Sequence, residues 1–418
     1  MTKTPGLKVI YLVIYPLDVR DAKRFGLTEL QDAGLQVEVW DLSHFVHPAA
    51  SGLGIESPNW VNITVCSSVE HFSNLCSTLT AEHTVILFGL LRREQLWQAR
   101  KLLRLISATP ARLGSISSGQ TPPPILPGRC APLVSGRIGR VFRLLSHPRK
   151  WKKTPLHLAS VMLLQLIAVQ RRMHLRSSIR PLDHIWASTM VSGIGSIFAN
   201  ESTKVTYIHT LDYDQVLAIR KSGRQPLSRV VFIDSMGPLH PDYLLLFGES
   251  VISAQTYSEI ICRGLDEIER RLGTQVVVAA HPRSAPGVME AWYGGRTLFF
   301  GKTAELVAYA TAIFVAECST AIGLATVFQR PLVILSSAKF DSFIQDGNRA
   351  FSRELSTPII DLDAPDLPPF NLNVNEEAYA QYVEKYIKRP GTPEEPFWSV
   401  VASEIVSGAQ PPDVQMLD

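Results

Sequence analysis

The chain has 418 residues, of which 46% are apolar, 8% aromatic and 19% charged, and it contains 28 prolines and 26 glycines. This composition suits two or three globular domains and excludes an intrinsically disordered or collagen-like chain. The net charge is only +3, from 41 Lys and Arg against 38 Asp and Glu, but the charges are unevenly distributed.

The N-terminal segment has the pattern of a β-α-β unit. A continuous apolar, β-branched run over residues 8–15 predicts a first strand. A helical pattern from Val19 to Leu30 predicts one helix closed by Gly34, and residues 35–41 predict a second strand. Because Asp18 and a turn follow the first run, with no small-residue cleavage site, we interpret that run as a strand and not as a leader.

The next predicted elements lead into a region of different composition. A strand at 84–88 and an amphipathic helix at about 92–106 precede a Pro-, Gly- and Ser-rich loop at 117–128. A helix predicted at about 156–173 has the most apolar face of the chain. Its longest apolar run, 159–169, contains polar residues and is about half of the roughly 20 residues that span a bilayer, so no spanning helix is expected.

Basic charge is concentrated between Glu94 and Asp183, an interval without any acidic residue. Residues 95–182 hold 16 Lys and Arg, whereas the rest of the chain, with 25 Lys and Arg against 38 Asp and Glu, carries a net charge of −13. Residues 129–153 place eight of these cations among Val, Phe, Leu and Trp. Such a segment can insert apolar side chains at the headgroup level, while each cation near anionic lipid contributes on the order of 1 kcal/mol.

We therefore expect residues 129–153 to attach the protein peripherally to an anionic membrane surface. A basic solvated face and a nucleic-acid patch are the alternatives, but no RNA- or DNA-binding motif accompanies the charge, so no nucleic-acid partner is expected. The five cysteines are odd in number and widely spread, with no CxxC pair and no histidines at zinc-ligand spacing. A reducing cytoplasm fits this cysteine usage best.

After Asp183 the alternation of strands and helices resumes. Short buried strands are predicted at 184–188, 205–208, 229–234, 275–280, 296–300, 312–316 and 331–335. Helices are predicted at 256–272, where Gly273 ends the helix, and at 303–309, 320–328 and about 398–406.

This order predicts an α/β fold with two parallel, doubly wound, Rossmann-like domains. The first covers about 1–205, with a basic helical insertion at about 110–180, and the second covers about 206–390. A C-terminal helix and tail follow at 391–418. In such sheets, ligands bind beyond the carboxyl ends of the strands, where three candidate sites of the second domain lie.

The first candidate is Asp234, at the end of the strand 229–234. A carboxylate after four apolar residues has a fixed backbone, and partial burial would tune its pKa for catalysis. The alternative is an aspartate that caps the turn formed by residues 235–238.

The second candidate is the His-Pro-Arg turn at 281–283. Because proline fixes this turn, we expect the side chains of His281 and Arg283 to point into the crevice, where they suit a phosphate or a carboxylate. A structural histidine with satisfied hydrogen bonds is the alternative. His240 begins a second His-Pro dipeptide, but it follows a turn and is a weaker candidate.

The third candidate, Glu317-Cys318-Ser319-Thr320, precedes a helix predicted to open at Ser319 or Thr320. Two hydroxyls and the N–H groups of a helix N-terminus can hold a phosphate without a metal. An ordinary N-cap is the alternative. Together, a carboxylate, a His-Pro-Arg turn and a hydroxyl-capped helix after successive strands predict a site for a phosphate-bearing donor.

Two other motifs are not interpreted as sites. Gly295 and Gly301 resemble the glycines of a P-loop, but five residues separate them instead of four, and the residues between are strand-like. Asp212 and Asp214 resemble a metal-binding DxD pair, but no carboxylate cluster accompanies them and Asp212 can cap the following helix. No metal and no cofactor are expected.

The order of four segments resembles the carboxy-terminal half of bacterial surface-polysaccharide glycosyltransferases of GT-B type. The segments are IHTLDYD (208–214), VVFIDSMGPLHPD (231–242), VVAAHPR (277–283) and VAECSTAIGLA (315–325). They are most similar to enzymes that use CMP-activated acidic sugars, Kdo transferases and sialyltransferase-like enzymes, which carry a His-Pro motif and a Ser/Thr motif. A sialyltransferase-style acidic pair followed by Gly is absent. The resemblance covers about 205–335 and implies two domains that face a cleft.

The resemblance also implies roles for single residues. The CMP phosphate would be held by His281, Ser319 and Thr320. Asp234 would be the catalytic carboxylate, as the nucleophile of a retaining β-Kdo transferase or, as in inverting relatives, as the base for the acceptor hydroxyl. Contacts to the sugar carboxylate or the donor would come from Arg283 and Glu317. Weaker candidates in the same motifs are His209, Asp212, Asp214 and His240.

The residues and the resemblance together predict a glycosyltransferase that moves an ulosonic sugar, Kdo in the first place, from a CMP donor. The acceptor would be a lipid-linked, lipopolysaccharide or capsule oligosaccharide at the cytoplasmic face of the bacterial inner membrane, which the basic segment would contact. The alternatives are a transferase for a sialic-acid-like nonulosonate, a nucleotide-sugar 2-epimerase, and a non-catalytic membrane-bound adaptor that binds nucleotide.

Overall fold

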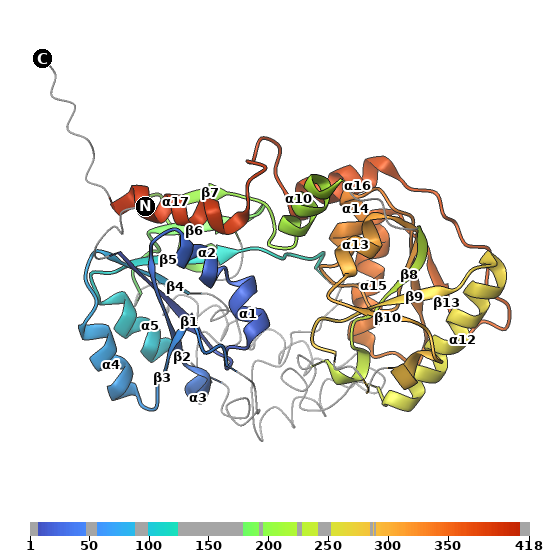
Figure 1. The fold of residues 1–418 in the computed structure, drawn as a ribbon, viewed down its shortest axis with the longest axis horizontal. Helices are drawn as coiled ribbons and strands as arrows, with labels where there is room; N and C mark the ends of the chain where they lie inside the picture. The colour runs from blue at the N-terminus through green and yellow to red at the C-terminus, as the bar shows by residue number, and fades with distance from the viewer. Residues whose placement is uncertain are drawn as a thin grey trace, which may run out of the picture. The chain divides into compact units, whose positions relative to one another are not determined.

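Two compact units make up the computed structural model of the chain (Figure 1). The first comprises Met1–Ser118, Pro127–Ile208 and Glu395–Asp418, and the second comprises Gly119–Leu126 and His209–Glu394. The chain therefore enters the second unit twice, and its last segment belongs to the first unit. The structure describes residues 7–46, 57–87, 99–123, 179–191, 195–223, 228–240, 252–284, 287 and 290–409.

The first unit is built on a parallel sheet. Within the described residues this sheet has seven strands in the order β3-β2-β1-β4-β5-β6-β7, and every neighbouring pair is parallel. The strands are β1 (Lys8–Val13), β2 (Gln36–Asp41), β3 (Asn62–Val65), β4 (His83–Ile86), β5 (Arg112–Ser117), β6 (His184–Ala187) and β7 (Lys204–Tyr207). The sequence predicts all of them except β3 and β5.

The second unit repeats this topology. Its sheet, in the part of the chain that is described, has six parallel strands in the order β10-β9-β8-β11-β12-β13. The strands are β8 (Arg229–Ile233), β9 (Val276–Ala280), β10 (Leu298–Phe300), β11 (Ala310–Val315), β12 (Leu332–Ser336) and β13 (Ile359–Asp361). In both sheets the winding direction reverses beside the first strand, between β1 and β4 and between β8 and β11.

Both faces of the second sheet are buried, because alternate residues of its strands enter two different apolar clusters. Val231 and Ile233 of β8 pack into one cluster, and Val230 and Phe232 pack into the other. Parallel strands covered on both faces are the doubly wound α/β arrangement. The predicted fold class, α/β with two Rossmann-like doubly wound domains, is therefore confirmed.

Helices and turns connect the strands. Those described in the first unit are α1 (Val19–Arg24), α2 (Leu27–Asp32), α3 (Ser43–Val46), α4 (Val69–Ser77), α5 (Arg100–Ser107), α9 (Gly195–Phe198) and α17 (Phe397–Ala409). Those described in the second unit are α10 (Tyr213–Ser222), η1 (Gly237–Leu239), α12 (Ala254–Leu272), η2 (Glu290–Tyr293), α13 (Thr303–Ala308), α14 (Ile322–Val327), α15 (Ser342–Leu355), α16 (Glu376–Tyr382) and η3 (Val383–Ile387).

The single helix predicted from Val19 to Leu30 is wrong, because the chain forms α1 and α2 on either side of Gly26. Gly26 has a φ of 61°, in the left-handed region that favours glycine. A Cβ atom there would lie 2.0 Å from Cγ of Trp398, whose indole N–H donates to the carbonyl of Arg24 at 2.9 Å. The interruption is therefore made by α17, from the other end of the chain.

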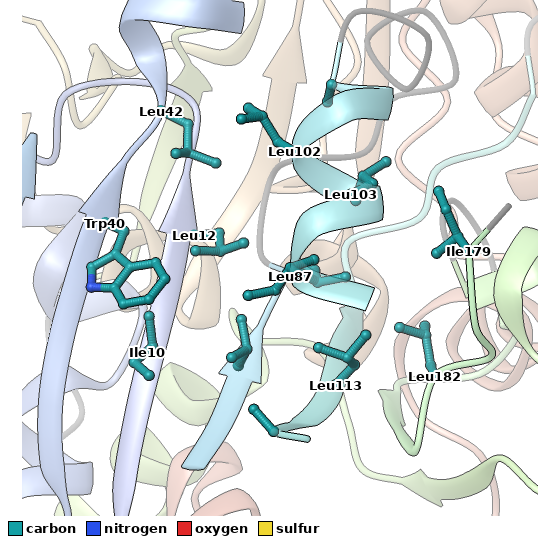
Figure 2. Close-up of a cluster of buried hydrophobic side chains, with 14 of the residues drawn as sticks. Ile10, Leu12, Trp40, Leu42, Leu87, Leu102, Leu103, Leu113, Ile179 and Leu182 are labelled. Atoms are coloured by element: carbon teal, nitrogen blue, oxygen red, sulfur yellow. The ribbon is translucent and has the colours of Figure 1, made fainter. Parts of the chain in front are cut away.

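Strand β5 has no sequence signal because its residues, RLGSIS, are mostly small or polar. Glycine is required at position 114, since a Cβ atom there would lie 2.5 Å from the indole of Trp186 on β6. Leu113 of the same strand joins the apolar core of the first unit, together with Leu102 and Leu103 of α5 (Figure 2).

The basic segment at 129–153 and the apolar helix predicted at 156–173 lie outside the described residues. In the described part of the chain, no helix is both long enough and apolar enough to cross a bilayer. The described cysteines are free thiols, and burial raises the pKa of both Cys66 and Cys76 to about 12.

Replacing Gly26 with alanine is expected to lower the free energy of unfolding by about 2–4 kcal/mol, because the methyl group strains a left-handed residue and displaces Trp398. Gly34→Ala is the matched control, since Gly34 also has a positive φ, 87°, but nothing lies within 4 Å of an added Cβ. Urea unfolding followed by tryptophan fluorescence measures both losses. Equal losses in the two variants would contradict the importance of the Trp398 contact.

Candidate functional site

Three loops of the second unit lie at one edge of its sheet because they follow adjacent parallel strands. Strands β9, β8 and β11 are neighbours in this order, and the loops after them begin at His281, Asp234 and Ala316. The reversal of winding lies between β8 and β11. In doubly wound sheets, ligands bind outside the carboxyl ends of the strands at such a reversal.

The carboxylate of Asp234 lies at the centre of this edge and is only 3% exposed. Its Oδ1 atom accepts hydrogen bonds from the hydroxyl of Tyr293 at 2.6 Å and the N–H of Met236 at 2.7 Å. Its Oδ2 atom accepts from the N–H of His281 at 3.1 Å and the hydroxyl of Ser284 at 3.3 Å. Burial raises the pKa of this carboxyl above its usual value, and the four hydrogen bonds oppose that rise.

This geometry agrees with the alternative in which Asp234 caps a turn. The hydrogen bond from Met236 closes an Asx turn, in which Met236 has a φ of 66° and Gly237 a φ of 36°. A catalytic carboxylate must approach the reacting atom to within about 3–3.5 Å. Since both oxygens of Asp234 are directed at donors of the protein itself, the structure favours a positioning role over the catalytic role expected from the sequence.

The two His-Pro dipeptides lie against each other. The imidazole rings of His240 and His281 are 5.2 Å apart between centroids and inclined at 69°. The N–H of Arg283 donates to Nδ1 of His281 at 3.2 Å, which assigns the proton of the neutral imidazole to Nε2. His281 is half-buried and Arg283 is exposed. His240, the weaker candidate from the sequence, therefore belongs to the same cluster as His281.

The loop after β11 is held by Asn348 of α15, which is 1% exposed. Its Oδ1 atom accepts from the N–H of Cys318 at 3.1 Å, and its Nδ2 group donates to the carbonyl of Ala316 at 2.9 Å and to that of Leu335 at 3.3 Å. Burial, followed by the charge of Glu317, raises the pKa of the Cys318 thiol well above its usual value, so Cys318 stays neutral.

The helix after this loop differs from the prediction. It begins at Ile322 and has only six residues, and its N-cap, Ala321, makes no side-chain capping hydrogen bond. Ser319 accepts from the N–H of Ala321 at 3.4 Å within the loop. The expected helix start with a hydroxyl cap is therefore wrong. Ser319 and Thr320 are half-buried loop residues, and a Cβ atom at Gly119 would lie 3.8 Å from the methyl group of Thr320.

The weaker candidates His209, Asp212 and Asp214 lie at or just before the start of α10, where His209 and Asp214 contact each other or the backbone. His209 is fully buried, with Nδ1 2.9 Å from the carbonyl of Thr210 and Nε2 3.7 Å from the carboxylate of Asp214. Asp212 occupies the N-cap position of α10 without a capping hydrogen bond, and it lines a small crevice together with Thr320. Among the described residues, no group of three or more His, Cys, Asp or Glu side chains could hold a metal ion.

Sequence reasoning misses three residues that shape this edge. Ser284 follows His281 by three positions, so the turn itself could have indicated it. Tyr293 and Asn348 come from η2 and α15, far from the loops that they hold, and no local pattern marks them.

No family model matches the sequence, and no curated protein matches it significantly. Solved structures that match along the chain include the spinosyn forosaminyltransferase SpnP, with 12% identity, a TM-score of 0.39 and coverage of 97% of this chain and 95% of that one. The glycosyltransferase SnogD from Streptomyces nogalater has 9% identity, a TM-score of 0.42 and coverage of 97% and 100%. MurG from Acinetobacter baumannii has 11% identity, a TM-score of 0.38 and coverage of 97% and 96%. Because these scores do not establish a shared fold, the architecture rests on the strand pairing described above.

Asp234→Asn is expected to destabilise the protein by about 1.5–3 kcal/mol, because the amide nitrogen would face an N–H or hydroxyl donor. Burial raises the folded-state pKa of Asp234 above its usual value of 3.8, so its contribution to wild-type stability falls as the pH rises from about 4. The asparagine variant does not titrate at this position, so it lacks this dependence of stability on pH. The difference in urea unfolding free energy between the two proteins should be largest near pH 4 and narrow towards pH 8, and a difference that widens would contradict this account.

Proposed function

We propose that this chain is a glycosyltransferase of GT-B type whose second unit holds a nucleotide-activated sugar. The observation that carries the proposal is the position of His281, Ser319 and Thr320, in loops after strands at the reversal of winding. Two Rossmann-like units in one chain are also the architecture implied by the sequence resemblance.

The chemistry of these three side chains suits the phosphate of a leaving nucleotide. With Nδ1 of His281 accepting from Arg283, the Nε2–H group is the donor, and it can donate to a phosphate oxygen without a change of protonation. The hydroxyls of Ser319 and Thr320 add two donors. Negative charge grows on the phosphate as the glycosidic bond breaks, and donors fixed in advance stabilise that charge.

The donor that we propose is a CMP-activated ulosonic acid, with Kdo as the first candidate and a sialic-acid-like nonulosonate as the second. The resemblance of the four sequence segments supports this choice. Arg283 is exposed at the end of the His-Pro turn, where its guanidinium can pair with the carboxylate of the sugar. Glu317 can accept hydrogen bonds from sugar hydroxyls. The proposal assigns no role to a metal or cofactor, since His281 and the two hydroxyls supply donors for the phosphate.

The acceptor that we propose is a lipid-linked, lipopolysaccharide or capsule oligosaccharide at the cytoplasmic face of the bacterial inner membrane. The support is the charge pattern, because residues 129–153 combine eight cations with apolar side chains. An enzyme held at an anionic surface meets a lipid-linked acceptor there at high local concentration.

Calorimetric titration of the purified protein with CMP, UDP and GDP tests the nucleotide site. We expect selective binding of CMP, and His281→Ala should weaken that binding by more than tenfold, about 1.4 kcal/mol, because a phosphate donor is lost. His44→Ala, which removes an exposed histidine from the first unit, is the control and should bind CMP as the wild type does. A preference for UDP or GDP would overturn the donor class, and no binding to any of the three would overturn the nucleotide site.

Binding to phosphatidylglycerol vesicles in about 0.1 M salt tests the membrane partner, because close contacts survive screening at this ionic strength. Replacing four cations of the segment with glutamine, Arg149, Lys150, Lys152 and Lys153, should weaken binding by more than tenfold at about 1 kcal/mol for each cation. The control replaces four exposed lysines elsewhere: Lys23, Lys101, Lys221 and Lys339. Equal losses in both variants would show that total charge, not this segment, drives attachment.

A further inference from the structure

We propose that Asp234 and Tyr293 form a buried clamp that fixes both His-Pro turns, so that Tyr293 is a positioning residue of the phosphate site. This inference rests on the proposed function and assigns Asp234 a task different from catalysis. It is carried by the four hydrogen bonds of the Asp234 carboxylate, which join three separate segments of the second unit.

The clamp holds the turn that begins with His281 at both of its ends. Oδ2 of Asp234 accepts the N–H of His281 and the hydroxyl of Ser284, and the N–H of Ser284 donates to the carbonyl of His281 at 2.8 Å. The N–H of Arg283 then donates to the imidazole. The direction of the His281 ring is therefore determined by a backbone that Asp234 holds in place.

The same carboxylate shapes the turn that leads to His240. Oδ1 of Asp234 accepts the N–H of Met236 and so stabilises its left-handed conformation, which is costly for a residue other than glycine. Gly237 follows, where a Cβ atom would lie 2.8 Å from the ring of Tyr257, and the N–H of His240 donates to the carbonyl of Gly237 at 3.1 Å. The close approach of the two imidazole rings depends on both turns.

Tyr293 fixes the carboxylate itself. It is fully buried at the end of η2, and its 2.6 Å hydrogen bond to Oδ1 is the shortest of the four that Asp234 accepts. Burial raises the pKa of this phenol well above its usual value, so the hydroxyl remains a donor. The preceding residue, Trp292, accepts at its carbonyl from Ser258 at 2.9 Å and Cys262 at 3.2 Å, which ties η2 to α12.

Tyr293→Phe removes this hydrogen bond and keeps the ring. Tyr379→Phe is the matched control, because it also removes one hydrogen bond from a buried tyrosine of the second unit: the hydroxyl of Tyr379 donates to the carbonyl of Arg330, just before β12, at 3.2 Å. Two readouts apply to both variants: the affinity for CMP by calorimetry, and the imidazole carbon–proton NMR signals of His240 and His281, including the NOE between the rings. The NMR readout needs no nucleotide.

We expect Tyr293→Phe to weaken CMP binding by at least fivefold, to shift both histidine signals and to weaken their NOE, whereas Tyr379→Phe should change affinity by less than twofold. If Tyr293→Phe lowers only the melting temperature and leaves affinity and histidine signals as in the wild type, the residue is structural and the proposal is overturned. If Tyr293→Phe does not fold, Ser284→Ala replaces it, with the same expectations and the same contradicting result.

Failure of the proposed function gives a different pattern. A wild-type protein that binds no nucleotide, but whose histidine signals still shift in Tyr293→Phe and not in Tyr379→Phe, retains the clamp and loses the nucleotide site. Histidine signals that are insensitive to both substitutions overturn the clamp, whatever the nucleotide affinity.

Discussion

The buried carboxylate of Asp234 is the interaction on which the arrangement of the second unit's sheet edge depends. A carboxylate that is 3% exposed is costly unless donors replace the water that it has lost, and four donors do so here. These donors come from the turn after β8, the turn after β9 and η2. Satisfying one buried charge therefore orders three segments that no regular secondary structure joins.

The third loop at this edge, after β11, is ordered by a neutral side chain, the amide of Asn348. Asn348 uses both its amide oxygen and its amide nitrogen to hold the backbone at Ala316 and Cys318, directly before Ser319 and Thr320. Both side chains are buried. Asn348 lies on α15, outside the loop that it holds, whereas Asp234 begins the loop after β8 and also holds the turn after β9. The exposed side chains at this edge, such as Arg283, therefore extend from a backbone that buried hydrogen bonds hold in place. Such preorganisation lowers the cost of binding a charged ligand.

Much of the fold could be predicted from the sequence, because parallel strands buried on both faces are continuous apolar runs and most of the runs here are of that kind. Two of the exceptions have physical causes that lie elsewhere in the chain. Gly26, where the predicted helix breaks, lies against the indole of Trp398, and Gly114 of β5 lies against the indole of Trp186. Because each contact comes from another element, the local pattern predicts one unbroken helix in the first case and no strand in the second.

In the candidate site, too, the features with a local sequence signal could be predicted, and those set by distant contacts could not. The sequence predicts the positions of Asp234 and His281 at the sheet edge, because the end of an apolar run is a local signal and each residue directly follows a strand. What each side chain does there depends on its partners, and Tyr293 and Asn348 carry no sequence signal for that task. Asp234 has the position expected of a catalytic carboxylate, but its hydrogen bonds are those of a turn cap.

The central claim is that the edge beside the reversal of winding in the second unit holds a nucleotide phosphate. A crystal structure of the protein with CMP tests it most directly. The account predicts a phosphate within hydrogen-bond distance, about 2.7–3.2 Å, of Nε2 of His281 and of the hydroxyl of Ser319 or Thr320, with Asp234 still bonded to Tyr293. CMP bound elsewhere on the chain, or a phosphate that reaches none of these side chains, would contradict it.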